Sequence, residues 1–215
     1  MKVIKNMILM ISIVALSCQI YFDISPNIDL SVLGRVIIVS IEVLGFTSVY
    51  LYYRNRVTVE KREKYFKILM WLLFIIYLIN LSYLLFLDRG MGRHMRFLEN
   101  IDEYLKYNVN LKPFASILIY INSYKQGYLN LSIITTNLLG NLIAFMPFAV
   151  FLPKLFRTQR NTFAYFITVS LIIIAVEVIQ VITMTGTGDI DDYILNVIGS
   201  MILFFIMKCF RKEEV

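Results

Sequence analysis

The feature that most constrains this chain is a set of six apolar segments, each close to the length that crosses a lipid bilayer. A transmembrane helix needs about 20 predominantly apolar residues. Backbone groups in lipid must form their hydrogen bonds within the segment, and the alternating pattern of a membrane β-barrel is missing. We therefore predict an all-α integral membrane protein, a bundle of about six transmembrane helices. The segments are Met7–Ile24, Val32–Tyr53, Phe66–Leu87, Ile133–Leu152, Thr162–Ile182 and Tyr193–Phe210.

The composition excludes an ordinary soluble domain. Hydrophobic residues make up 59% of the chain and charged residues only 17%, which is too few charges for a soluble surface. The formal net charge of +6 does not indicate nucleic-acid binding, because lysine and arginine occur in short clusters between apolar segments. Such clusters determine membrane topology instead. Membrane lipids are therefore the expected surroundings, and no nucleic acid is expected as a partner.

The basic clusters also predict which side of the membrane each link faces, since cytoplasmic links carry an excess of lysine and arginine. Two links have this excess, the second with Arg54, Arg56, Lys61, Arg62, Lys64 and Lys67 and the fourth with Lys154, Arg157 and Arg160. We therefore expect a multi-pass protein with both termini in the cytoplasm. The third link, Asp88–Ser132, then faces outward. Its apolar part, Phe114–Ile121, suits a short interfacial helix or a re-entrant turn.

The cysteines and the single histidine suggest no disulfide framework and no zinc site. Cys18 and Cys209 lie in apolar segments near opposite ends of the chain, and His94 has no second histidine to pair with. The first 19 residues also resemble a bacterial lipoprotein signal that would be cleaved before Cys18. Hydrophobicity continues through Phe22, which favours an uncleaved first helix.

Polar residues inside the apolar segments are functional candidates, because an ionisable group in hydrocarbon is costly unless it is paired. Asn137 and Asn141 share one face near the start of the fourth segment, and Glu177 and Gln180 share a face near the end of the fifth. Glu177 suits either a neutral hydrogen-bond donor, a proton-transfer group or a packing partner. Pro147 predicts a kink in the fourth helix.

The stretch Thr185–Gly199, TGTGDIDDYILNVIG, brings three carboxylates to the start of the last helix. We expect Gly186 and Gly188 to supply turn flexibility, and Asp189 or Asp191 to cap the helix. Asp192, Asn196 and Gly199 then share one helix face. All these polar faces lie at the outer membrane level, which predicts a ligand-binding set. Its members are Asn137, Asn141, Glu177, Gln180, Asp189, Asp192 and Asn196.

Several of these motifs, in this order, resemble those of the VanZ-like family of bacterial membrane proteins. They are Leu111–Phe114, Asn137, Gly140 with Asn141, Phe145–Phe148, Glu177–Gln180, Asp189–Asp192, Asn196 and Gly199. The resemblance predicts a VanZ-like domain over residues 66–212 with a four-helix core, preceded by a two-helix extension over residues 1–65. Many members carry an arginine just before the first aspartate of the last motif. Here Arg89 and Arg93 are the candidates to replace it.

The resemblance implies a role in the bacterial cell envelope. The founding member of the VanZ-like family is associated with reduced susceptibility to the glycopeptide antibiotic teicoplanin. The implied partners are membrane lipids together with a cell-wall precursor or a lipoglycopeptide, and no cofactor is implied. Abundant isoleucine, lysine, asparagine and tyrosine suit a low-GC Gram-positive source. The oligomeric state is left open.

Two other functions and a structural explanation suit the same residues. A membrane enzyme would use Glu177 as acid or base, with Asp189 and Asp192 assisting it or holding a hard divalent cation. The sequence shows no activated serine or cysteine and no phosphate-binding loop, so catalysis is left open. A transporter would use Glu42 in mid-membrane with Arg35, although Glu42 also suits a packing pair or an added interface. All the polar residues would otherwise serve helix association.

Overall fold

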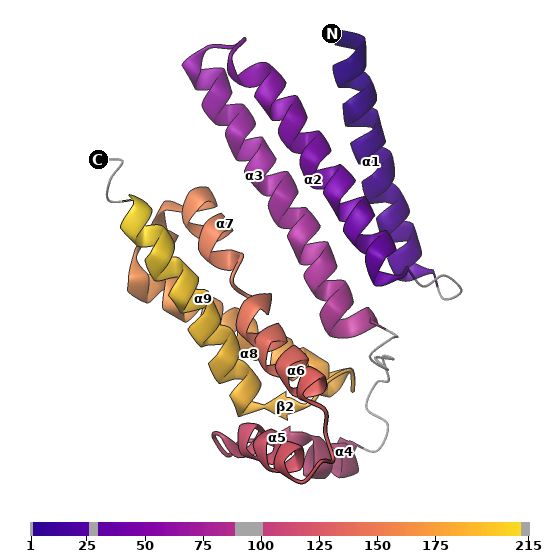
Figure 1. Ribbon diagram of the computed structural model, residues 1–215. Helices are drawn as coiled ribbons and strands as arrows, with labels where there is room; N and C mark the ends of the chain where they lie inside the picture. Colours follow the sequence, from indigo (N-terminus) through magenta and orange to yellow (C-terminus); the bar gives the residue numbers. More distant parts are fainter. Residues whose placement is uncertain (1, 26–29, 89–100, 212–215) are drawn as a thin grey trace. The chain divides into compact units, whose positions relative to one another are not determined.

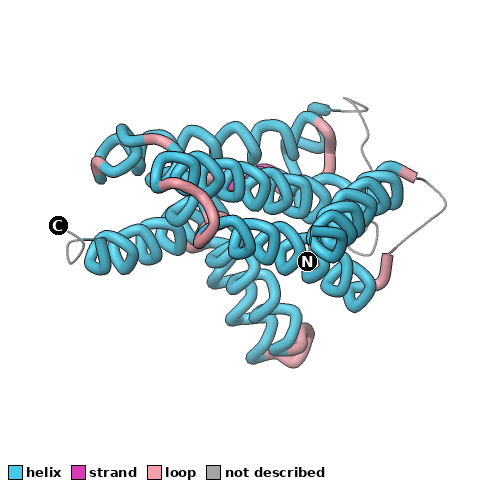
Figure 2. Tube along the Cα trace, turned by 90° about the horizontal axis from the view of Figure 1, so that it is seen from above, coloured by secondary structure: helices cyan, strands magenta, loops and turns pink. Residues whose placement is uncertain are grey.

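The computed structural model describes residues 2–25, 30–88 and 101–211 and confirms the all-α class (Figure 1). Nearly all of the described chain is helical, and strand is confined to two very short pieces (Figure 2). Within the described residues, six helices are long and apolar enough to cross a membrane: Val3–Ile24, Val32–Arg54, Val59–Leu87, Leu131–Leu155, Thr162–Ile182 and Ile190–Phe210. The chain divides into two compact units, Met1–Leu84 and Leu85–Val215. Arg89, Arg93 and His94 lie outside the described residues.

The first unit consists of three helices that follow one another in the chain. They are α1 (Lys2–Ile24), α2 (Val32–Arg54) and α3 (Val59–Ser82), and α3 continues into a π-helical turn at Tyr83–Leu87. Helices α1 and α2 meet at Gly45, where a β-carbon would collide with the fully buried side chain of Ser12. Close approach at small residues is the usual way in which membrane helices pack.

A buried polar cluster lies between the helices of the first unit. Arg35 forms its ion pair with Asp23 and stacks on the ring of Tyr83, 3.4 Å from the guanidinium carbon to the ring centroid. Glu42 is fully buried, and the side-chain amide nitrogen of Gln19 lies 2.9 and 3.2 Å from its two carboxylate oxygens. The ion pair of Arg35 is therefore with Asp23, and the buried carboxylate of Glu42 is in contact with Gln19.

The second unit is built on three membrane helices. They are α6 (Leu131–Ala144) with α7 (Phe148–Leu155), α8 (Thr162–Ile182) and α9 (Ile190–Arg211), and a 3-10 turn at Arg157–Arg160 precedes α8. The kink expected at Pro147 is a full break between α6 and α7, at residues 145–147.

The core of the second unit fixes α9 against α8. The rings of Tyr165 and Phe204 stack with their centroids 4.2 Å apart, and both residues are fully buried. The hydroxyl of Tyr165 also shares a hydrogen bond with that of Ser200. This pairing leaves the N-terminal half of α9 free to face α6 and α8 with its polar residues.

The long third link is not a plain loop. It contains α4 (Ile101–Asn108), strand β1 (Val109–Asn110) and α5 (Ala115–Lys125). Of the short helix and the re-entrant turn expected over Phe114–Ile121, the structure has a helix, α5, which extends to Lys125. Strand β1 pairs in parallel with β2 (Gly188–Asp189), with Val109 opposite Gly188. The sequence did not predict this pairing, which joins the third link to the start of α9.

Helices α6 and α9 cross closely at Gly199. A β-carbon at this position would overlap the main-chain carbonyl group of Leu142. Backbone atoms cannot turn aside as the end of a side chain can, so the crossing requires glycine. It holds Asn196 and Asp192, about one and two turns earlier in α9, beside α6.

We predict that Gly199→Ala destabilises the folded protein by about 1–3 kcal/mol, the usual cost of overpacking a filled interior. Gly140→Ala in α6 is the matched control, because its β-carbon would meet nothing within 4 Å in the described structure. Alanine favours a helix over glycine, so the control is expected to be as stable as the parent or slightly more stable. Thermal unfolding in detergent measures both. Equal stability of the two variants would contradict the close crossing.

Candidate functional site

Each of the three aspartates at the start of α9 has a different partner. Asp189 is the helix cap: its Oδ1 accepts a hydrogen bond of 2.9 Å from the backbone N–H of Asp191. A carboxylate here satisfies a backbone donor that the helix leaves without a partner and complements the positive end of the helix dipole. Of the two candidates for the cap, Asp189 takes the role.

Asp191 instead holds the third link. Its carboxylate is almost fully buried and accepts hydrogen bonds from the backbone N–H groups of Phe114, Ser116 and Ile117, the last two at 2.9 and 3.2 Å. These N–H groups open α5. Phe114 has a φ of 64°, a left-handed conformation that is costly for a residue with a side chain. Asp191 therefore caps a helix some 75 residues away in the sequence, as the separations of 77, 75 and 74 show.

Asp192 faces the interior of the second unit. Its Oδ1 accepts a hydrogen bond from the side-chain Nδ2 of Asn141 in α6. This bond joins two polar residues that the sequence analysis placed in one ligand-binding set. The side chains of Asn141 and Asp192 also form part of the wall of a cavity.

This polar cavity has a volume of about 670 Å³. Its wall contains six of the seven residues predicted to bind a ligand. Carboxylates, amides and hydroxyls predominate among the residues that line it: Leu85, Tyr120, Ser132, Ile133, Thr136, Asn137, Asn141, Phe145, Val176, Glu177, Gln180, Thr185, Gly186, Thr187, Asp192 and Asn196. Polar residues from α6, α8 and α9 thus converge on one space.

The side-chain amides that line the polar cavity differ in whether their polar atoms have hydrogen-bond partners within the protein. Gln180 donates to the backbone carbonyl of Leu85 at 3.2 Å, and Asn137 donates to that of Ile133 at 2.8 Å. Asn196 is only 3% exposed, and its Oδ1 has no hydrogen-bond partner among the described residues. A buried acceptor left in this state costs about 1–3 kcal/mol. It is therefore a position where a ligand donor would be stabilising.

Tyr120 is a cavity residue that the sequence analysis missed. It lies in α5, which the hydrogen bonds of Asp191 place beside the start of α9, and its side chain lines the polar cavity. Burial raises the pKa of the Tyr120 phenol above its usual value, and the nearby charges of Asp192 and Asp189 raise it further. The phenol therefore keeps its proton at neutral pH and can donate a hydrogen bond.

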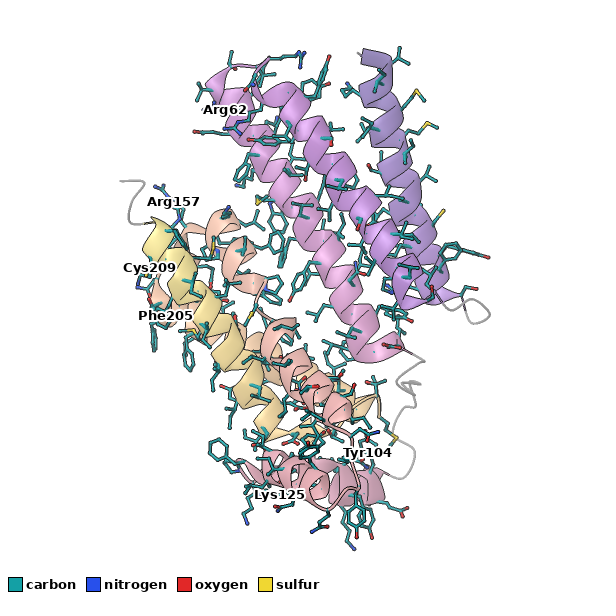
Figure 3. All side chains as sticks on the ribbon, viewed as in Figure 1. Arg62, Tyr104, Lys125, Arg157, Phe205 and Cys209 are labelled. Carbon is teal, nitrogen blue, oxygen red and sulfur yellow. The ribbon has the colours of Figure 1, made fainter. Side chains whose placement is uncertain are left out.

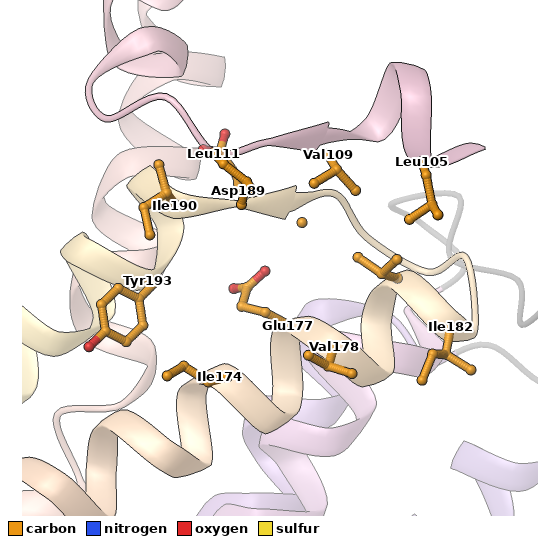
Figure 4. A pocket seen from close by; sticks show the side chains of 12 residues that line it. Leu105, Val109, Leu111, Ile174, Glu177, Val178, Ile182, Asp189, Ile190 and Tyr193 are labelled. Carbon is orange, nitrogen blue, oxygen red and sulfur yellow. The ribbon is translucent and has the colours of Figure 1, made fainter. Parts of the chain in front are cut away.

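A second, apolar cavity lies on the other side of Glu177. Its volume is about 570 Å³, and ten of its residues carry no charge: Leu105, Val109, Leu111, Ile174, Val178, Val181, Ile182, Gly188, Ile190 and Tyr193. Figure 4 shows the Glu177 carboxylate directed from α8 into this space, with Asp189 on the strand opposite. Asp189 is the seventh predicted ligand-binding residue, and it lines this cavity and not the polar one. Glu177 lines both.

Gly186, just before β2, and Gly188, the first residue of β2, are both positions of close packing. Neither has a positive φ; the left-handed residue of this turn is Met184, with a φ of 53°. A β-carbon on Gly186 would lie 3.0 Å from the Gln180 side chain, and one on Gly188 would lie 2.8 Å from that of Val181. Crowding by α8 therefore explains why both positions are glycine, and the expected turn flexibility stays a prediction.

The binding of a divalent cation at Asp189 and Asp192 remains a prediction. The described residues contain no group of three or more histidine, cysteine, aspartate or glutamate side chains that could hold a metal ion. Asp189 and Asp192 also line different cavities. A cation here would need amide oxygens or ligand atoms to complete its coordination.

Comparison with known proteins identifies one family. Residues 74–211 match the model of the VanZ/LLP1 family, from the middle of α3 to the end of α9. The matched region contains every residue that lines the two cavities. No curated protein and no solved structure matches the chain.

Proposed function

This chain belongs to the VanZ/LLP1 family, and we propose that its polar cavity opens to the outer side of a bacterial cell membrane. There it binds a lipid-linked or cell-wall precursor or a lipoglycopeptide, and it contributes to glycopeptide resistance of the teicoplanin type. The observation that carries the proposal is the convergence of Asn137, Asn141, Glu177, Gln180, Asp192 and Asn196 on one cavity.

The cavity supports ligand binding over helix association alone. If these residues served only packing, their polar atoms would satisfy one another, as Asn141 and Asp192 do. The Oδ1 of Asn196 is buried without such a partner in the described structure. The space of about 670 Å³ also falls within the range of ligand pockets, roughly 300–1,000 Å³.

The enzyme and transporter alternatives have less support. The backbone N–H of Asp191 occupies Asp189, which lines the apolar cavity, whereas Asp192 lines the polar cavity; this gives less support to the two acids as an assisting pair or as paired cation ligands. The residues of the transporter alternative, Glu42 and Arg35, are held by Gln19 and Asp23 in the first unit. Such interactions are those of packing residues that also satisfy buried charge.

We predict that Asp192→Ala and Asn196→Ala abolish the envelope phenotype while the protein stays in the membrane. Each removes a polar group from the cavity wall, and the loss of Asp192 also leaves the Asn141 amide without its acceptor. The measurement is the teicoplanin concentration that inhibits a host expressing each variant, with membrane levels from immunoblots. Asp102→Ala is the control, because Asp102 is an exposed carboxylate of α4 that lines neither cavity. Variants that keep full resistance would contradict the proposal.

The outward orientation predicts opposite labelling at the two ends of the second unit. The hydroxyl of Tyr104 donates to the carbonyl of Gly186, and Figure 3 shows Tyr104 and Arg157 at opposite ends. In a background in which the exposed Cys18 and Cys209 are changed to serine, Thr187→Cys should react with an impermeant maleimide in intact cells. Arg157→Cys should react only after the cells are opened. The reverse pattern would place the cavity on the cytoplasmic side.

A further inference from the structure

A groove with basic residues lies between α2 and α3 of the first unit, at the end where the two helices are joined. Its volume is about 460 Å³, which falls within the range of ligand pockets, roughly 300–1,000 Å³. Figure 3 shows Arg62 at this end of α3. We call it the α2–α3 groove, and its lining residues are Tyr50, Arg54, Arg62, Glu63 and Phe66. All five precede residue 74, where the family match begins, so the proposed function does not involve them.

Helical spacing arranges the groove in two layers. In α2, Tyr50 and Arg54 are four residues apart and share a helix face. In α3, Arg62 and Phe66 have the same spacing. The two helices are joined by residues 55–58, so both arginines lie near the link and both aromatic residues lie about one turn further into the helix pair. The rings of Tyr50 and Phe66 are in contact, with their centroids 5.7 Å apart.

This order of layers matches the boundary between membrane hydrocarbon and water. Aromatic residues are enriched at that boundary, and basic side chains extend from it toward the lipid headgroups. Phe66 begins the apolar part of α3, whereas the link before it is rich in lysine and arginine. A lipid at this position would place its phosphate beside the arginines and its glycerol and upper chains beside the rings.

The two arginines of the groove are placed to reach such a ligand. Arg54 and Arg62 are both exposed, and both line the groove. Arg56 differs, because it donates a hydrogen bond of 2.9 Å to the carbonyl of Tyr52 and stacks on that ring, 4.2 Å from the guanidinium carbon to the centroid. The nearby basic residues therefore do not all have the same role, and the lining pair is the one directed to the groove.

The charge of this region favours an anion. Among the described residues that line the groove, two carry guanidinium groups and one, Glu63, carries a carboxylate. Between residues 54 and 67 the sequence has six basic residues and two acids. The positive end of the α3 dipole lies at the same place, since α3 begins at Val59. Guanidinium groups bind phosphate oxygens through paired, charge-assisted hydrogen bonds, so a phosphate ester is the anion that fits best.

We propose that the α2–α3 groove binds the headgroup of an anionic phospholipid. Arg54 and Arg62 hold the phosphate diester, and Tyr50 and Phe66 contact the glycerol and the start of the acyl chains. The occupant is a lipid and not free phosphate, because the aromatic layer contributes only to a ligand with an apolar part. This site belongs to the first unit and is independent of the polar cavity.

Native mass spectrometry of the full chain in a neutral detergent at neutral pH tests the proposal. The probes are phosphatidylglycerol, phosphatidylcholine and phosphatidylethanolamine with identical acyl chains. We expect phosphatidylglycerol to bind at least about fivefold more tightly than either zwitterionic lipid. Arg54→Gln with Arg62→Gln should weaken its binding at least about tenfold, because the phosphate loses its charge-assisted hydrogen bonds. Equal binding of the three lipids, or full affinity in the double variant, would overturn the proposal.

Lys61→Gln with Lys64→Gln is the matched control. It removes the same number of positive charges, from exposed positions in the same part of α3, but changes no residue that lines the groove. At about 0.15 M salt, screening weakens the effect of charges that do not touch the ligand, so the affinity should fall by no more than about threefold. Equal losses in the two double variants would show that the lipid responds only to net charge, and the groove would be rejected as a site.

A second comparison separates a lipid from a free phosphate ester. Phe66→Ala should weaken phosphatidylglycerol binding at least about threefold, since the chains lose apolar contact. Ile68→Ala is its control, because Ile68 is an exposed residue of α3 outside the groove. Glycerol phosphate, which has no acyl chain, should fail to displace the lipid at about tenfold excess. Displacement by glycerol phosphate, or binding that is unchanged in Phe66→Ala, would exclude a lipid from the groove.

Discussion

The arrangement of the second unit depends on one buried interaction, the carboxylate of Asp191 with three backbone N–H groups at the start of α5. These N–H groups belong to the first turn of a helix and have no partner within it. By accepting from all three, Asp191 fixes the third link to the start of α9. The β1–β2 pairing and the bond from Tyr104 to Gly186 hold the same segments together.

This attachment explains why the last helix begins with three acids, although one carboxylate would cap it. Asp189 caps α9, Asp191 caps α5, and only Asp192 contributes its carboxylate to the polar cavity. Because α5 is held in place, Tyr120 comes to lie beside Asp192 and completes the wall. The cavity is therefore assembled from segments that are distant in sequence, and Glu177 and Asp192 contribute its carboxylates.

Local sequence patterns predicted the membrane helices and much of the polar wall, since both follow from periodicity. The lengths of the apolar segments predicted the six membrane-spanning helices, and helical spacing predicted that Asp192 and Asn196 share one helix face. Pairing across the chain could not be predicted in this way. The roles of Asp191 and Tyr120 depend on where α5 docks, and the apolar cavity depends on β1. Gly186 and Gly188 are glycine because side chains of α8 crowd both positions, and no local sequence pattern reveals this crowding.

The measurement that tests this account most directly is amide hydrogen exchange at Ser116 and Ile117, the donors to Asp191. Asp191→Asn turns one acceptor into a donor facing those N–H groups. We predict slow exchange in the parent protein and exchange at least about fivefold faster in the variant, as the loss of about 1–3 kcal/mol of protection requires. Asp102→Asn, on the exposed surface of α4, should leave both amides slow. Exchange at Ser116 and Ile117 that is unchanged by Asp191→Asn would contradict the central role of this carboxylate.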